Sequence, residues 1–209
     1  MIKAILFDVG GVLQLGRFSL FPFGVHRSMS VHKFMARKLH ITLDQWFDSI
    51  DTSYAESIEG KISKQKALSI MSTDLETTPE HLESLFVRAY RKFYKRNNEL
   101  YDLAFSIKKK GYKIAILSDQ WHVSKEALIL SSDSRKFNVS IVSCDVGMRK
   151  PDPRIYRLAL RKLHIKPHEA IFIDNQKWNI TPAKKLGLKT ILYFNNRNLI
   201  KELKKLGIL

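Results

Sequence analysis

Five short apolar segments constrain the fold of this chain most strongly, because each of them ends in polar or glycine residues. The segments are KAILFDVGG, YKIAILSDQ, VSIVSCDVG, EAIFIDNQ and KTILYFNN, and helical patterns separate the later ones. Strands that are apolar throughout are typical of a parallel sheet covered by helices on both faces. Because crossover connections are right-handed, the pattern predicts an α/β fold with a doubly wound parallel sheet.

A long helical segment interrupts this alternation after the first apolar run. Residues 16–97 carry helical patterns such as LDQWFDSI and HLESLFVRAYRKFY, and we expect no strand among them. An insert that follows the first strand should lie above the carboxyl edge of the sheet, as a cap. The sequence therefore predicts an α/β core over residues 1–15 and 98–209, with an inserted all-helical cap domain over residues 16–97.

The composition is that of a globular protein, with 44% hydrophobic and 27% charged residues in a chain of 209. This length is enough for one core and a smaller satellite domain. No apolar run reaches the roughly 18 residues of a membrane span. The single cysteine, Cys144, excludes an internal disulfide and fits a reducing compartment. We therefore expect a cytoplasmic protein without membrane contacts, monomeric, with a dimer left open.

The charge balance is strongly basic, because 36 lysines and arginines face 20 acidic residues for a net charge of +16. Such a balance raises the question of a nucleic-acid partner. The basic residues are scattered, however, and no RNP-like aromatic strand, zinc-finger spacing or Arg/Gly-rich tail accompanies them. We therefore expect a solvated basic surface that attracts small anionic molecules, without a nucleic-acid partner.

Polar residues gather where the predicted strands end. Asp8 ends the first strand, Ser118 and Asp119 end the second, and Asp174 and Asn175 end the fourth. In open α/β sheets, ligands bind at the carboxyl ends of the strands. A carboxylate at the end of an apolar run is also costly to bury without a partner. These positions are therefore the candidates for chemistry.

Four motifs at these positions together resemble the haloacid dehalogenase superfamily, whose members are mostly phosphatases. The motifs are LFDVGGVL with Asp8, AILSD with Ser118, GMRKPDPRIY with Lys150 and IFIDNQKWNITPAKKLGL with Asp174. The helical insert resembles the C1-type cap of subfamily IA. Within that subfamily, the GMRKP motif and the cap step GKIS are similar to those of phosphatases that act on α-D-glucose 1-phosphate.

The resemblance implies the roles of the motif residues. Asp8 would be the nucleophile, forming a covalent intermediate that water hydrolyses, and Lys150 would balance the negative charges. Asp8 and Asp174 would bind Mg²⁺ together with the backbone carbonyl of Gly10, because Mg²⁺ takes oxygen ligands. Asn175 stands where many relatives carry a second acid, so it would contribute to the metal site directly or through a water.

The remaining motif residues would bind the phosphoryl group or support the loops. The Ser118 hydroxyl and the backbone N–H groups of Gly11 and Asp119 would hold phosphoryl oxygens. Asp145 either orients the motif lysine or caps a loop, and these two interpretations stay open. Asn179 is expected to brace the last motif.

Two positions depart from the family pattern. Most family phosphatases carry an acid two residues after the nucleophile, where this chain has Gly10. Positioned proton transfer is worth about 10²–10⁴ in rate, so the substrate should have a leaving group that needs little help, such as a glycosyl phosphate. Asp119 replaces the usual Asn, and its charge would weaken phosphate binding unless it is paired or turned outward.

Three functions remain open. The favoured one is a Mg²⁺-dependent hydrolase of small phosphorylated metabolites, with a sugar phosphate as substrate. A 2-haloacid dehalogenase also uses an Asp nucleophile without the second acid, but it works without metal and its fourth motif resembles Ser-Ser-Asn, whereas this chain has Asp174. The third is a catalytically weak binding or regulatory module whose basic surface contacts RNA or acidic partners.

We expect the aromatic and histidine residues near the motifs to pack in the core or lie on the surface, without a role in the site. Trp178 and Trp121 follow motif residues and could line a pocket, but packing is favoured. Trp46 and Tyr54 of the cap are expected in its core, and His122 is expected on the surface.

Overall fold

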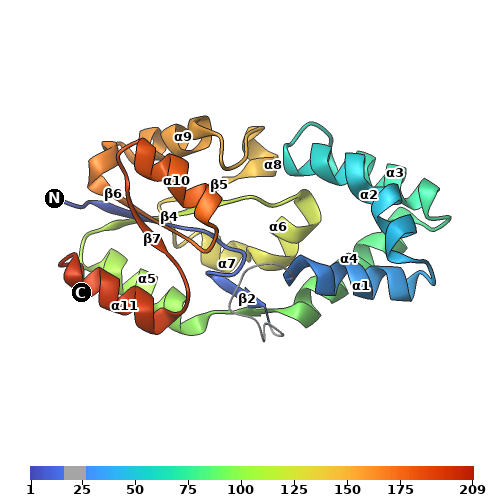
Figure 1. Ribbon diagram of the computed structural model, residues 1–209, viewed down its shortest axis with the longest axis horizontal. Helices are drawn as coiled ribbons and strands as arrows, with labels where there is room; N and C mark the ends of the chain where they lie inside the picture. Colours follow the sequence, from blue (N-terminus) through green and yellow to red (C-terminus); the bar gives the residue numbers. More distant parts are fainter. Residues whose placement is uncertain (17–26) are drawn as a thin grey trace.

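The computed structural model describes residues 1–16 and 27–209, and a parallel sheet forms its centre (Figure 1). Five strands follow the spatial order β5–β4–β1–β6–β7, and every neighbouring pair is parallel. The strands are β1 (Ala4–Phe7), β4 (Lys113–Ser118), β5 (Val139–Val142), β6 (Ala170–Asp174) and β7 (Lys189–Leu192). Each coincides with one of the five apolar segments, so the predicted α/β fold is confirmed.

Alternate residues of β1 pack into two separate apolar cores, one on each face of the sheet. Ile5 and Phe7 belong to one core, whereas Ala4 and Leu6 belong to the other, because successive side chains of a strand point to opposite faces. Helices cover both faces, with α9 and α10 on one side in Figure 1 and α5 and α11 on the other. These helices are α5 (Asn98–Lys109), α9 (Pro153–Leu163), α10 (Lys177–Lys185) and α11 (Asn196–Lys205).

Helices α1 to α4 make up the insert, at the right of Figure 1. They are α1 (Arg27–Lys38), α2 (Leu43–Ile58), α3 (Lys64–Asp74) and α4 (Pro79–Phe93). Thr42, Ser63 and Thr78 accept backbone N–H groups at the starts of α2, α3 and α4, which satisfies donors that a helix leaves unpaired. Trp46 is fully buried in the cap, as predicted. None of the described helices is both long and apolar enough to cross a membrane.

A short antiparallel ladder connects the insert to the core. Strand β2 (Gln14–Gly16) pairs with β3 (Tyr94–Arg96), so the chain leaves and re-enters the core side by side. The expectation of no strand in residues 16–97 is wrong at β3, because three residues are too few to show a period-two pattern. The first part of the predicted cap, residues 17–26, lies outside the described residues, and the domain boundaries stay a prediction.

The cap rests on helix α6 (His122–Leu128) and on the short helix α8 (Ser143–Val146), which follows β5. Ser57 Oγ of α2 lies 3.0 Å from His122 Nδ1, so His122 is a contact between cap and core, contrary to the expectation of a surface residue. Gly60 has a φ of +67°, and a Cβ there would lie 2.6 Å from the carbonyl oxygen of Cys144. This position therefore needs glycine, since only its missing side chain lets the two backbones meet.

Candidate active site

Three ionisable side chains meet at the carboxyl edge of the sheet. Asp8 directly follows the central strand β1, and Asp174 ends the neighbouring strand β6. Lys150 comes from the loop before α9, and its Nζ lies 2.8 Å from Asp8 Oδ1 and 2.7 Å from Asp174 Oδ2. All three residues are buried. The parallel topology thus brings together Asp8 and Lys150, which are 142 positions apart in the sequence.

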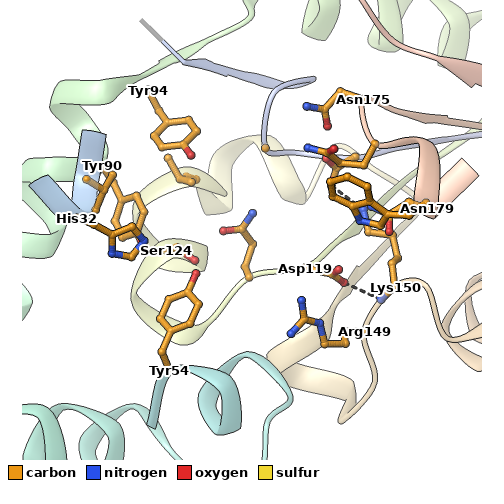
Figure 2. Close-up of a pocket in the computed structure, with 17 residues that line it drawn as sticks. His32, Tyr54, Tyr90, Tyr94, Asp119, Ser124, Arg149, Lys150, Asn175 and Asn179 are labelled. Atoms are coloured by element: carbon orange, nitrogen blue, oxygen red, sulfur yellow. Dashed lines mark hydrogen bonds and ion pairs between the residues drawn. The ribbon is translucent and has the colours of Figure 1, made fainter. Parts of the chain in front are cut away.

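Lys150 is held from both its side chain and its backbone. Burial is the largest influence on its side chain and would lower its pKa, but the carboxylates of Asp8, Asp174 and Asp119 outweigh burial and raise the pKa. Lys150 is therefore a permanent cation between two buried carboxylates. Its backbone N–H also donates to Asp119 Oδ1 over 2.9 Å, a contact drawn as a dashed line in Figure 2.

The Asp8 carboxyl lies in an environment that disfavours its charge. Burial raises the pKa of Asp8 to about 7 against the opposing charge of Lys150, and the Asp174 carboxylate raises it further. A positive charge close to a carboxyl favours the ionised form. A second cation beside Asp8 would therefore be needed for full ionisation at neutral pH.

Asp174 is fixed by the loop and helix that follow it. Its Oδ1 accepts the Gln176 backbone N–H over 2.7 Å, and its Oδ2 accepts Asn179 Nδ2–H over 3.0 Å. The backbone carbonyl of Asn179 in turn accepts the Tyr156 hydroxyl. These contacts place Asn179 where a residue that braces this loop should be.

The oxygen atoms around Asp8 and Asp174 fit a small hard cation such as Mg²⁺. Asn175 lines the cavity beside them, and its buried Oδ1 has no hydrogen-bond partner among the described residues. Gly10, the predicted carbonyl ligand, lines the same cavity. The described part of the chain holds no cluster of three or more His, Cys, Asp or Glu side chains suited to a metal. Two carboxylates completed by neutral oxygens and water are a common way of binding Mg²⁺, so the donor set fits this ion.

Of the three residues predicted to bind phosphate, only Asp119 lines the cavity. Its Oδ1 accepts the Lys150 backbone N–H, but Asp119 makes no ion pair with another described residue. Ser118 is fully buried, and its Oγ accepts Gln120 Nε2–H over 3.2 Å, so Gln120 lines the cavity in its place. Gly11 does not line the cavity either. Ser118 could reach a phosphoryl oxygen only after Gln120 released it, and its predicted role stays a prediction.

Position 10 offers no proton donor, although a side chain would fit there. A Cβ on Gly10 would lie 3.9 Å from Gln120 Nε2, an ordinary van der Waals contact, and Gly10 is not in the left-handed region. The backbone therefore does not require glycine at this position. Its consequence is chemical, since no side chain at position 10 can give a proton to a ligand in the cavity.

A cavity of about 260 Å³ above these groups has two different walls (Figure 2). The cap, together with strand β3 that connects it to the core, contributes uncharged side chains. The core contributes charged side chains and the exposed ring of Trp178 at the rim. The first wall consists of Val31, His32, Tyr54, Tyr90 and Tyr94. The second includes Asp8, Asp119, Arg149, Lys150 and Trp178. The cavity therefore joins the predicted site to a pocket large enough for a small molecule.

Sequence reasoning missed or misplaced several of these residues. His32, Gln120 and Arg149 had no predicted role. The position of Arg149 beside Lys150 in GMRKP could have marked it as a site residue, whereas nothing in the local sequence marks His32. Tyr54, expected in the cap core, does pack against that core, and it also lines the cavity, which was not expected. Trp178 is 62% exposed at the rim, so the packing favoured for it is wrong.

Two other interpretations are resolved by the packing. Trp121 is fully buried and donates its Nε1–H to the Tyr90 hydroxyl over 2.7 Å, as expected for a packing residue. Asp145 pairs with Lys125 over 2.6 Å at the surface. Asp145 therefore does not orient Lys150. Asp119 contacts Lys150 instead, through the Lys150 backbone N–H.

Comparisons with known proteins place most of the chain in one family model. Residues 2–187 match the model described as haloacid dehalogenase-like hydrolase. Bifunctional epoxide hydrolase 2 of Mus musculus is 31% identical over 172 residues, which cover 79% of this chain and 28% of that protein. The chain thus spans well under half the length of the epoxide hydrolases it matches. Shorter matches include proteins named as a haloacid dehalogenase and as phosphatases.

Solved structures share the fold of this chain. A HAD-like family hydrolase from Porphyromonas gingivalis gives a TM-score of 0.76 at 21% identity, covering 99% of this chain and 98% of that one. A HAD family enzyme from Bacteroides thetaiotaomicron, solved with magnesium and inorganic phosphate, gives 0.71 at 19% identity, covering 91% and 93%. At these identities the likeness establishes the fold alone.

Proposed function

This chain belongs to the haloacid dehalogenase-like hydrolases, and we propose that it is a Mg²⁺-dependent phosphatase of small phosphorylated metabolites, with a sugar phosphate as substrate. One observation carries the proposal: Lys150 lies between the carboxylates of Asp8 and Asp174 at the ends of adjacent strands. This arrangement supplies one carboxylate for attack, a second for a cation, and an ammonium that keeps both in place. The magnesium and phosphate bound by a protein of the same fold support it.

Asp8 supplies the nucleophile in this mechanism. One carboxylate oxygen attacks phosphorus in line, so that an Asp8–phosphorus bond forms as the bond to the leaving oxygen breaks. Phosphoryl transfer depends mainly on positioning and on neutralised charge, and Lys150 keeps a positive charge 2.8 Å from Asp8. Water then attacks the phosphorus of the aspartyl phosphate, which releases inorganic phosphate and regenerates the Asp8 carboxylate. The leaving oxygen takes its proton from solvent, since Gly10 offers none.

The residues that would hold Mg²⁺ are Asp8, Asp174, Asn175 and the Gly10 carbonyl. When bound, the ion supplies positive charge that favours ionised Asp8 and offsets the charge of the phosphoryl oxygens. Gln176 and Asn179 hold the Asp174 carboxylate in place through hydrogen bonds. The fold therefore fixes this proposed ligand.

Arg149 supports an anionic substrate. It lines the cavity beside Lys150, and its guanidinium makes no ion pair or hydrogen bond with another described residue. Lys150 is already paired with two carboxylates, whereas the Arg149 charge is available to a ligand. Guanidinium groups bind phosphate and carboxylate oxygens through paired hydrogen bonds.

A 2-haloacid dehalogenase is the second candidate, because Gly10 and the match to a haloacid dehalogenase favour it. Its nucleophile would again be Asp8, which would attack carbon and displace halide. The buried Asp174 carboxylate argues against it, because a reaction without metal has no need of a second acid at that point. The phosphatase is therefore the better supported function.

Phosphate release from p-nitrophenyl phosphate and a panel of sugar phosphates tests the proposal, with Mg²⁺ and with EDTA. We expect turnover that requires Mg²⁺ and falls by about 10⁴-fold or more in Asp8→Asn, because an amide is not a nucleophile. Asp102→Asn is the matched control, since Asp102 is exposed on α5 away from the cavity.

The absence of turnover on every phosphorylated compound, with and without Mg²⁺, would overturn the phosphatase. Chloride release from 2-chloropropionate without metal would establish the dehalogenase instead. Salt-sensitive RNA binding without any turnover would point to a binding module.

A further inference from the structure

His32 of the cap is held in one protonation state by its neighbours. The Trp46 indole Nε1–H donates to His32 Nδ1 over 2.9 Å, and Trp46 is fully buried. An indole nitrogen can only donate, so Nδ1 must accept and the ring proton must be on Nε2. Burial lowers the pKa of His32 to about 4, which keeps the ring neutral at physiological pH. The ring also packs against Phe47, with centroids 5.0 Å apart.

The Nε2–H of His32 is available to a ligand. His32 lines the cavity, and its only hydrogen bond among the described residues is the one from Trp46. Figure 2 shows the imidazole at the cap wall beside Tyr54 and Tyr90. A neutral N–H fixed in this way is a donor that does not need to reorganise when a ligand binds.

Tyr54 places a second uncharged polar group in the same wall. It projects from α2 toward the cavity in Figure 2, and its hydroxyl makes no hydrogen bond with another described residue. Burial, together with Tyr94, raises its pKa to about 12, so the hydroxyl stays protonated and can both donate and accept. Tyr90 differs, because its hydroxyl already accepts the Trp121 Nε1–H.

The cap wall contains no charged residue among its described members, and the charged groups lie on the core side of the cavity. A second phosphate or carboxylate pressed against the cap would therefore be buried without an opposite charge. Hydroxyl groups suit this wall, because they match both a fixed donor and a phenol that donates and accepts. The cavity of about 260 Å³ has room for a leaving group of about monosaccharide size, and it adjoins a second hollow that shares Asp119, Arg149, Lys150 and Trp178.

We propose that His32 Nε2–H and the Tyr54 hydroxyl bind hydroxyl groups of the leaving group and so select small, uncharged polyol phosphates of about monosaccharide size. This inference rests on the proposed phosphatase function and adds the residues that determine its specificity. Asp8, Lys150 and Asp174 act on the phosphoryl group, whereas His32 and Tyr54 contact the part of the substrate that leaves.

The test compares kcat/KM for a polyol phosphate with that for p-nitrophenyl phosphate, which has no hydroxyl groups. A panel of hexose, pentose and glycerol phosphates supplies the polyol substrate. One neutral hydrogen bond contributes about 0.5–1.5 kcal/mol, so the polyol preference should fall about 2- to 12-fold in His32→Phe and in Tyr54→Phe. The loss should appear mainly in KM, because these groups touch the leaving group and not the reacting atoms.

Matched variants separate hydrogen bonding from folding. His32→Gln keeps an N–H donor and should retain most of the preference that His32→Phe loses. Asp51→Asn changes an exposed residue on the same helix as Tyr54 and should leave the ratio of the two kcat/KM values unchanged. Thermal melts of every variant show whether the cap is intact. Equal losses on both substrates in Tyr54→Phe and His32→Phe would overturn the proposal.

Two further results separate this proposal from the proposed function. Turnover of p-nitrophenyl phosphate without turnover of any polyol phosphate would overturn the specificity and leave the phosphatase intact, whereas turnover of neither would overturn both. ¹⁵N-edited NMR of the histidine rings supplies a readout independent of activity. It should show His32 as the neutral Nε2–H tautomer at pH 7, and an Nδ1–H tautomer or an imidazolium would contradict the proposal.

Discussion

The two walls of the cavity differ in how their polar groups are held. On the core side, Asp8 follows the buried strand β1 and Asp174 ends β6, so their positions come from the hydrogen-bonded register of the sheet. On the cap side, His32 and Tyr54 come from helices, and His32 is set by its contact with Trp46. The core wall is charged and the cap wall is neutral. The two carboxylates proposed for chemistry are therefore fixed by the backbone of the sheet, whereas the groups proposed for specificity are fixed by side-chain packing.

The largest effect on this comparison should come from removing the central cation of the core wall. Lys150→Met leaves two buried carboxylates facing each other, and breaking a buried ion pair in this way costs about 3–5 kcal/mol of unfolding free energy. Urea unfolding in the presence of EDTA measures it. Arg149→Met is the matched control, because Arg149 is exposed and makes no ion pair with a described residue, so its effect should stay within about 0.5 kcal/mol. Equal stability of the two variants would show that Lys150 does not hold the site together.

A smaller effect should follow from adding the missing acid at position 10. Because positioned proton transfer contributes roughly 10²–10⁴-fold in evolved sites, Gly10→Asp should raise kcat/KM for an alkyl phosphate by about 10-fold or more. The rate with p-nitrophenyl phosphate should change little, since its leaving group needs no proton. Gly10→Ala fills the same space without an acid and controls for packing. A rise that is equal for both substrates would contradict the leaving-group argument.

The last effect concerns the cap wall and its response to pH. His32 has a pKa of about 4 in the folded protein, against 6.5 for an unperturbed histidine. Between these two values the unfolded chain binds the proton more readily than the folded protein does. The neutral His32 ring therefore contributes fully to the unfolding free energy above pH 6.5, and this contribution declines as the pH falls toward 4. Urea unfolding of wild type and His32→Gln at pH 7, 5.5 and 4 measures it. The unfolding free energy of wild type minus that of the variant should decrease as the pH is lowered from 7 to 4. A difference that stays constant would contradict a neutral, buried His32.

Features that depend on neighbouring residues in the sequence could be predicted, whereas features that depend on contacts between distant residues could not. The five strands were predictable because burial on both faces of a parallel sheet leaves continuous apolar runs, and Asp8 and Asp174 were placed by where those runs end. Strand β3 was not predictable, since three residues carry no periodic signal. Trp178 was misplaced and the cavity contact of Tyr54 was missed, because an aromatic residue that packs and one that lines a cavity look alike in sequence.

Three features follow from the amino-acid sequence alone: the α/β fold, the helical segment after the first strand, and the strand-end carboxylates at positions 8 and 174. These features depend on local periodicity and on the rule that parallel strands end at one edge. Only the tertiary structure decided that Lys150 lies between the two carboxylates, that Gln120 covers Ser118 and that His32 faces the cavity with its proton on Nε2. The physical reason is that these arrangements result from contacts between distant segments, whose geometry no local pattern records.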